Sequence, residues 1–119
     1  MAGGVHRLPR QLPLKIAMGH LLTGRDMSAA RAAELGLVND VVPKSELDAV
    51  VGSYVDDILA CAPLAVRATK ECVMRGLDYS LAEAATRDYE WEQRRLASDD
   101  AKEGPKAFAE KRSPVWTGK

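Results

Sequence analysis

The side chains best suited to catalysis are few in this sequence and stand far apart. It has two histidines, His6 and His20, and two cysteines, Cys61 and Cys72. An imidazole needs a partner that orients it before it acts as a base or a metal ligand, and no carboxylate or thiol stands near His6. The cysteine spacing fits neither a zinc site nor a thioredoxin motif. We therefore expect exposed or packed imidazoles, free buried thiols and no metal site.

Two other groups of residues could bind a ligand. The glycine pair Gly3-Gly4 could open a helix and present free N–H groups to an anion, although close packing is the alternative. Near the C-terminus, Phe108 and Lys111 are three residues apart, a spacing that places two side chains on the same side of a helix. Together they would offer an apolar wall beside a cation. The alternative for Lys111 is an ordinary surface lysine.

Composition limits the classes of protein that fit. The 119 residues suffice for one domain, and 46% are hydrophobic, with many alanines and one phenylalanine, which suits close-packed helices. Seventeen basic and seventeen acidic residues balance, which argues against a nucleic-acid binder. No apolar run approaches the ~20 residues of a membrane span, and no leader segment is visible. The cytoplasm is the expected location, with no membrane or nucleic-acid partner.

Helix start and stop signals divide the chain into about six or seven helices, which predicts a mainly α fold. The first expected helix opens at the glycine pair of the 2–10 segment, and the others cover residues 13–23, 28–35, 45–59, 63–76, 80–97 and 98–112. Gly24 and Gly36 stop the second and third of them, and Ser28 and Ser45 are the expected N-caps of the third and fourth. A short apolar extended run is expected at 37–42, before Pro43.

The longest expected helix, 80–97, opens with a capping box formed by Ser80 and Glu83. Its second half is densely charged around Trp91. A solvated face with one packed indole is one interpretation, and a subunit contact is the other, since tryptophan and arginine are enriched at interfaces. After the last helix, we expect Trp116 to anchor the C-terminal tail by packing.

Several segments in order carry a resemblance to a known family. Leu-Leu-Thr-Gly (21–24), Ser-Ala-Ala-x-Ala-Ala-x-Leu-Gly-Leu-Val-Asn (28–39) and Val-Val-Pro (41–43) resemble the enoyl-CoA hydratase/isomerase (crotonase) family. Three further segments are similar to motifs of the same family: AGGVHRLPR (2–10), Ala-Pro-Leu-Ala (62–65) followed by Lys70, and Phe108-Ala-Glu-Lys-Arg (108–112). The resemblance covers nearly the whole chain.

The resemblance implies a fold and a place within it. The chain is similar to the C-terminal helical portion of a crotonase-like (ClpP/crotonase) fold, without the β-spiral core that lies upstream in the family. Residues 1–119 would then be a single C-terminal helical domain. Within it, residues 1–43 would end the region that flanks the core, and residues 44–119 would form the trimerisation and lid region.

The family's chemistry is hydration of 2-enoyl-CoA thioesters, or a related isomerisation, in fatty-acid or other acyl-CoA metabolism. The motifs that carry its oxyanion hole and acidic residues have no matching position here, so no catalytic residue is assigned and the isolated chain is expected to be inactive. The resemblance implies that Phe108 borders the acyl or pantetheine channel and that Lys111 reaches a phosphate of CoA. Coenzyme A would enter as part of the substrate, with no separate cofactor.

The family also implies a homo-oligomer, a trimer or hexamer, that binds an acyl-CoA thioester. Two alternatives to an enzyme fragment remain open. One is a non-catalytic helical module for oligomerisation, and the other is a stand-alone acyl-CoA-binding module.

Overall fold

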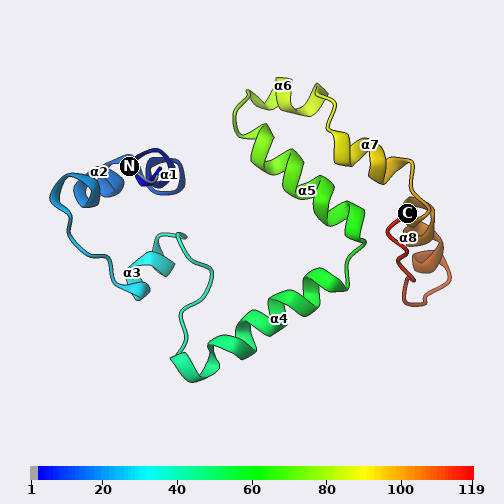
Figure 1. Cartoon of the computed structure of the whole chain (residues 1–119), viewed down its shortest axis with the longest axis horizontal. Coiled ribbons are helices and arrows are strands. Elements are labelled where there is room, and N and C mark those ends of the chain that lie inside the picture. The colour runs from blue at the N-terminus through cyan, green and yellow to red at the C-terminus, as the bar shows by residue number, and fades with distance from the viewer. Residues whose placement is uncertain (1–2) are drawn as a thin grey trace. The chain divides into compact units, whose positions relative to one another are not determined.

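The computed structural model describes residues 3–119, and over these residues the chain forms eight α-helices, one 3₁₀-helix and no strand (Figure 1). The prediction of a mainly α fold is confirmed, with eight helices where six or seven were expected. Ala2 of the AGG segment lies outside the described residues. The chain divides into two units, one ending at Asp48 and one beginning at Ala49. The expected functional division after residue 43 rests on the family resemblance and stays a prediction.

The elements follow one another with short connections. The first unit contains α1 (Gly4–Gln11), α2 (Leu14–Thr23), α3 (Ala29–Glu34) and the 3₁₀-helix Lys44–Glu46. The next helix, α4 (Leu47–Leu59), begins at the division and lies mostly in the second unit. The rest of the second unit contains α5 (Pro63–Gly76), α6 (Leu81–Thr86), α7 (Glu90–Leu96) and α8 (Asp100–Ala109).

Local signals in the first unit act as their residue types predict. Gly24 takes a left-handed conformation with φ of 65° and ends α2, and Gly36, with φ of 73°, follows α3. The Ser28 hydroxyl accepts a hydrogen bond from the Arg31 N–H at 3.2 Å and caps α3. The expected extended run at 37–42 forms no strand, because it has no neighbouring strand among the described residues to pair with.

The second unit is organised around α5, which makes its most extensive contacts with α7. Pro63 occupies the first turn of α5, where its missing N–H costs nothing. Leu64 and Ala68 lie one turn apart and are both buried. Figure 1 shows α6 at the C-terminal end of α5 and α7 running back beside α5.

The expected continuous helix 80–97 is wrong, because the structure breaks it into α6 and α7. The capping box is present, with the Ser80 hydroxyl accepting from the Glu83 N–H. The chain then leaves the helical conformation so that Tyr89 is buried, with its hydroxyl donating to the Ala84 carbonyl at 3.2 Å. The Glu71 carboxylate of α5 accepts the Trp91 N–H at 2.8 Å and so satisfies the new helix start.

The helical spacing of the apolar residues 64–73 predicts that Glu71 faces outward, paired with Arg75, and Glu71 does not face outward. Its side chain is only 11% exposed, although it makes the predicted i,i+4 pair with Arg75. The N–H of Trp91, followed by Arg75, lowers the pKa of Glu71. Ser45 lies inside the 3₁₀-helix instead of capping α4, because that 3₁₀ turn runs directly into the helix.

No residue of α4 is buried. Among residues 3–119, no single helix has both the length and the apolar character to cross a membrane; a bent pair, Lys44–Leu59 with Pro63–Gly76, meets that test only when both are taken together, by length and composition.

Candidate functional site: the end of α8 and the C-terminal tail

The candidate site is built on α8, whose first turn is fixed by polar contacts. The Ser98 hydroxyl accepts the Ala101 N–H at 3.2 Å, and Asp99 precedes the helix. Acidic residues in the first turn, Asp100 and Glu103, suit the helix dipole. Ala107 is 1% exposed and anchors the middle of the helix in the second unit.

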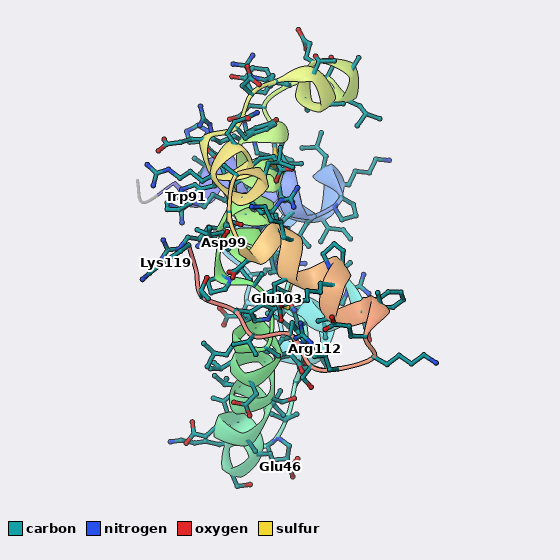
Figure 2. The ribbon with its side chains drawn as sticks, turned by 90° about the vertical axis from the view of Figure 1, so that its right-hand side faces the viewer. Glu46, Trp91, Asp99, Glu103, Arg112 and Lys119 are labelled. Atoms are coloured by element: carbon teal, nitrogen blue, oxygen red, sulfur yellow. The ribbon has the colours of Figure 1, made fainter. Side chains whose placement is uncertain are left out.

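The C-terminal tail (residues 113–119) folds back along α8. Figure 2 shows the tail returning from Arg112 to Lys119, which lies beside Asp99. The Asp99 N–H donates to the Lys119 carbonyl at 2.7 Å. The buried Asp100 carboxylate accepts the N–H groups of Thr117 at 2.8 Å and Gly118 at 2.9 Å, and the Thr117 hydroxyl at 3.1 Å. These bonds, the Thr117 N–H first, lower the pKa of Asp100 and fix the tail.

Trp116 anchors the tail, as the sequence predicted. Its indole N–H donates to the Ala60 carbonyl at 2.8 Å. The ring also lies against Gly104, where a Cβ atom would stand 3.4 Å from the indole. A glycine at 104 therefore lets the helix accept the aromatic ring at close range.

A network of ion pairs surrounds the end of α8 (Figure 2). The Arg112 guanidinium makes a fork with the two oxygens of Glu103, and its Nη2 lies 3.0 Å from Oε2. Its Nε also donates to Glu110 at 2.6 Å. The Glu103 carboxylate accepts the Val115 N–H at 2.8 Å. Arg112 and then the Val115 N–H lower the pKa of Glu103 to about 2.

Lys111 does not lie on the helix with Phe108. The helix ends at Ala109, and Lys111 takes a left-handed conformation with φ of 54° two residues later. The following N–H, that of Arg112, donates to the Ala107 carbonyl at 3.1 Å, which is the bond pattern of a helix C-terminus. The expectation that both residues share one helical face is therefore wrong. Phe108 is 87% exposed at the last turn, and Lys111 is exposed on the turn after it.

The histidines and cysteines form no cluster. His6 is exposed, and the Nδ1 of His20 lies 2.8 Å from the Arg25 carbonyl. Both thiols are free, as predicted, but Cys61 is exposed and Cys72 is partly buried, so the expectation of burial is wrong for Cys61. In the described part of the chain, no three His, Cys, Asp or Glu side chains come close enough to hold a metal ion.

Trp91 is the centre of a second polar and aromatic cluster. The guanidinium groups of Arg67 and Arg94 lie 4.9 and 4.7 Å from the centroid of its ring. An open groove of about 430 Å³ lies beside the ring, lined by Arg67, Lys70, Glu71, Met74 and Trp91. The sequence showed the neighbour Arg94 but gave no signal for Arg67, which comes from α5. Whether this face contacts another subunit stays a prediction.

Sequence reasoning missed the ion-pair network at the end of α8. Glu103 and Arg112 stand nine residues apart and belong to no helical i,i+4 pattern. Glu110-x-Arg112 was visible within the family-like segment, but nothing in its spacing indicated that one guanidinium binds two carboxylates.

Comparison with known proteins places this arrangement in a family. Residues 1–119 match the enoyl-CoA hydratase/isomerase family. Carnitinyl-CoA dehydratase of Proteus mirabilis (strain HI4320) is 43% identical over 122 residues, which cover 99% of this chain and 47% of that protein. (E)-benzylidenesuccinyl-CoA hydratase of Thauera aromatica is 41% identical over 115 residues, covering 97% of this chain and 45% of that protein. The chain spans about half the length of the curated relatives it matches.

Solved structures agree in fold. An enoyl-CoA hydratase of Bacillus anthracis has a TM-score of 0.91 and 35% sequence identity, with 99% of this chain and 46% of that chain covered. An enoyl-CoA hydratase of Mycobacterium tuberculosis H37Rv has a TM-score of 0.85 and 42% identity, with 98% and 46% covered. The helices match the C-terminal regions of crotonase-fold structures. This chain therefore belongs to the enoyl-CoA hydratase/isomerase family and corresponds to the C-terminal helical portion of its fold.

Proposed function

We propose that this chain supplies the C-terminal helices of an enzyme that adds water to, or removes it from, a 2-enoyl-CoA thioester. The single observation that carries the proposal is the match of the whole chain to the family. The names of both relatives described above, a dehydratase and a hydratase, denote enzymes that exchange water on a CoA thioester. The groups that stabilise an enolate oxygen would come from the part of the family fold that lies upstream of these helices.

The end of α8 is the proposed CoA contact. The exposed ring of Phe108 provides an apolar wall for the acyl or pantetheine part of the ligand. Lys111, exposed on the following turn, provides a cation for a phosphate of CoA. Coenzyme A enters this scheme only as part of the substrate. A homo-oligomer, a trimer or hexamer, in the cytoplasm completes the proposal.

CoA titration of the chain tests the contact. Isothermal titration is expected to show binding to the wild-type chain that is weakened in Lys111→Ala. Lys15→Ala, which removes an exposed lysine from α2 in the first unit, is the matched control and is expected to leave the affinity unchanged. No heat with the wild-type chain, or equal affinities for Lys111→Ala and wild type, would contradict the proposed contact.

Turnover of crotonyl-CoA tests whether the catalytic groups lie outside this chain. The purified 119-residue chain is expected to show no hydratase activity, because its sequence has no motif that matches the family's oxyanion hole. A chain extended upstream, in frame, into a spiral-core sequence is expected to be active. Steady turnover by the 119-residue chain alone would contradict this assignment.

A second candidate, a non-catalytic oligomerisation module, is favoured by one observation. The apolar side chains of α4 remain half-exposed, including Val51, Val55 and Ile58 at 51%, 46% and 53%. Apolar faces of this kind mark contacts with other chains or domains. Self-association of the chain, measured by sedimentation, combined with no response to CoA, would favour this candidate over the first.

A further inference from the structure

The backbone of Lys111 is unusual. Among residues 3–119 it is the one non-glycine residue with a positive φ, at 54°. Side chains other than that of glycine rarely adopt this conformation, and the residue after a helix end is usually glycine for that reason. Such a conformation persists only where the surrounding structure fixes it.

Arg112, the residue after Lys111, holds the chain on both sides of Lys111. Its backbone N–H closes the helix end on the Ala107 carbonyl at 3.1 Å. Its side chain binds Glu103 of α8 through a fork and Glu110 through Nε at 2.6 Å. Glu103 in turn accepts the Val115 N–H, which ties the start of the tail to the same carboxylate. The turn is therefore constrained before and after Lys111.

The same contacts decide which charges are neutralised. Glu103 and Glu110 are the carboxylates next to the turn, and both are paired with Arg112. Lys111 is exposed and makes no ion pair with any residue of the described chain. Lys111 is therefore an unpaired cation in a turn whose two acidic neighbours are both bound by Arg112.

We infer that Arg112 is a positioning residue: by binding Glu103 and Glu110 it fixes the turn and leaves the Lys111 ammonium available to a phosphate of the CoA substrate. This inference rests on the proposed CoA contact of Lys111. Arg112 itself needs no contact with the ligand, because four of its N–H donors are directed to the two carboxylates and, through Nη1, to the Ser113 carbonyl.

A double-mutant cycle in the 119-residue chain tests the inference. Arg112→Ala is expected to weaken CoA binding about fivefold, because a turn that is no longer held by Arg112 must be ordered on binding. The same change in a Lys111→Ala background is expected to have no further effect, since Arg112 acts through Lys111. Binding of pantetheine, which lacks the nucleotide phosphates, is expected to stay unchanged in all variants.

Arg112→Lys and Glu103→Gln extend the test if Arg112→Ala unfolds. Lysine keeps the charge but loses the fork, so partial loss of CoA affinity is expected. Arg31→Ala, which removes an exposed pair with Glu34 on α3, is the matched control and should bind CoA like the wild type.

The outcomes separate the inference from the proposed function. Equal CoA affinity of Lys111→Ala and wild type, or no CoA binding by the wild-type chain, overturns the proposed contact and the inference together. A loss in Lys111→Ala with none in folded Arg112→Ala, Arg112→Lys or Glu103→Gln overturns only the inference. So does an equal loss from Arg112→Ala in both backgrounds, which would show a general structural role.

Discussion

Two consecutive helices of similar length, α4 with 13 residues and α5 with 14, have opposite surroundings. Both sequences have apolar residues at helical spacing. In α5, Leu64 and Ala68 are buried, and Glu71 and Gly76 contact α7 and Tyr89. In α4, no residue is buried. An apolar stripe on a helix therefore predicts a face that packs against a partner. It does not show whether that partner belongs to the same chain.

The physical reason is which elements of the chain pack on each helix. The short connections after α5 bring α6 and α7 back onto it, so its groups find partners in the following elements, as Glu71 does with the Trp91 N–H. The α4 face has no element following it that returns in this way. The apolar side chains of α4 therefore stay half-exposed in this chain.

Removing buried volume from α5 is expected to have the largest effect on stability. Leu64→Ala should lower the free energy of unfolding by about 2–3 kcal/mol, because it leaves a cavity in the packed face of α5. Leu59→Ala on α4, where the side chain is 73% exposed, is the matched control and should change it by less than ~0.5 kcal/mol. Urea titration compares the two. Similar losses would show that α4 is covered in solution.

Removing the charge of Glu71 is expected to have the second-largest effect on stability. Glu71→Gln keeps the shape but weakens the acceptor for the Trp91 N–H and the pair with Arg75, so the Tm should fall by several degrees. Glu34→Gln, which affects only a surface pair with Arg31, should leave the Tm close to that of the wild type. An unchanged Tm in Glu71→Gln would mean that α7 starts without help from α5.

Acidification should expose the contribution of Glu103. Its pKa is lowered from 4.5 to about 2 in the folded chain, so its ion pair stabilises the fold above the ordinary pKa and is lost as the pH falls from 4.5 towards 2. The fall in Tm over this range should therefore be smaller in Glu103→Gln than in the wild type. Parallel Tm curves for the two proteins would contradict the lowered pKa.

Charging the α4 face should have the smallest effect on stability and a clear effect on association. The triple variant Val51→Lys, Val55→Lys and Ile58→Lys replaces half-exposed side chains, so the free energy of unfolding should change little. Sedimentation should show that it self-associates less than the wild type. A strictly monomeric wild-type chain at high concentration would contradict the contact role given to α4.

The sequence by itself determined much of the local structure and the family. Gly24, Ser28 and the Ser80–Glu83 capping box act within a single turn, where the residue type alone sets the backbone conformation and the hydrogen bond. The order of the family-like segments was readable for the same reason, because each is contiguous in the chain. Trp116 as a tail anchor was also predicted from its residue type.

Only the tertiary structure decided the features that join residues distant in sequence. The break at 87–89 depends on Glu71 and Gly76 of another helix, which supply an acceptor for the Trp91 N–H and room for Tyr89. The fork between Arg112 and Glu103 joins the turn that follows α8 to a residue nine positions earlier. A capping residue or a glycine acts through bonds to its near neighbours. An ion pair across nine residues, or a hydrogen bond across twenty, exists only once packing has brought its partners together.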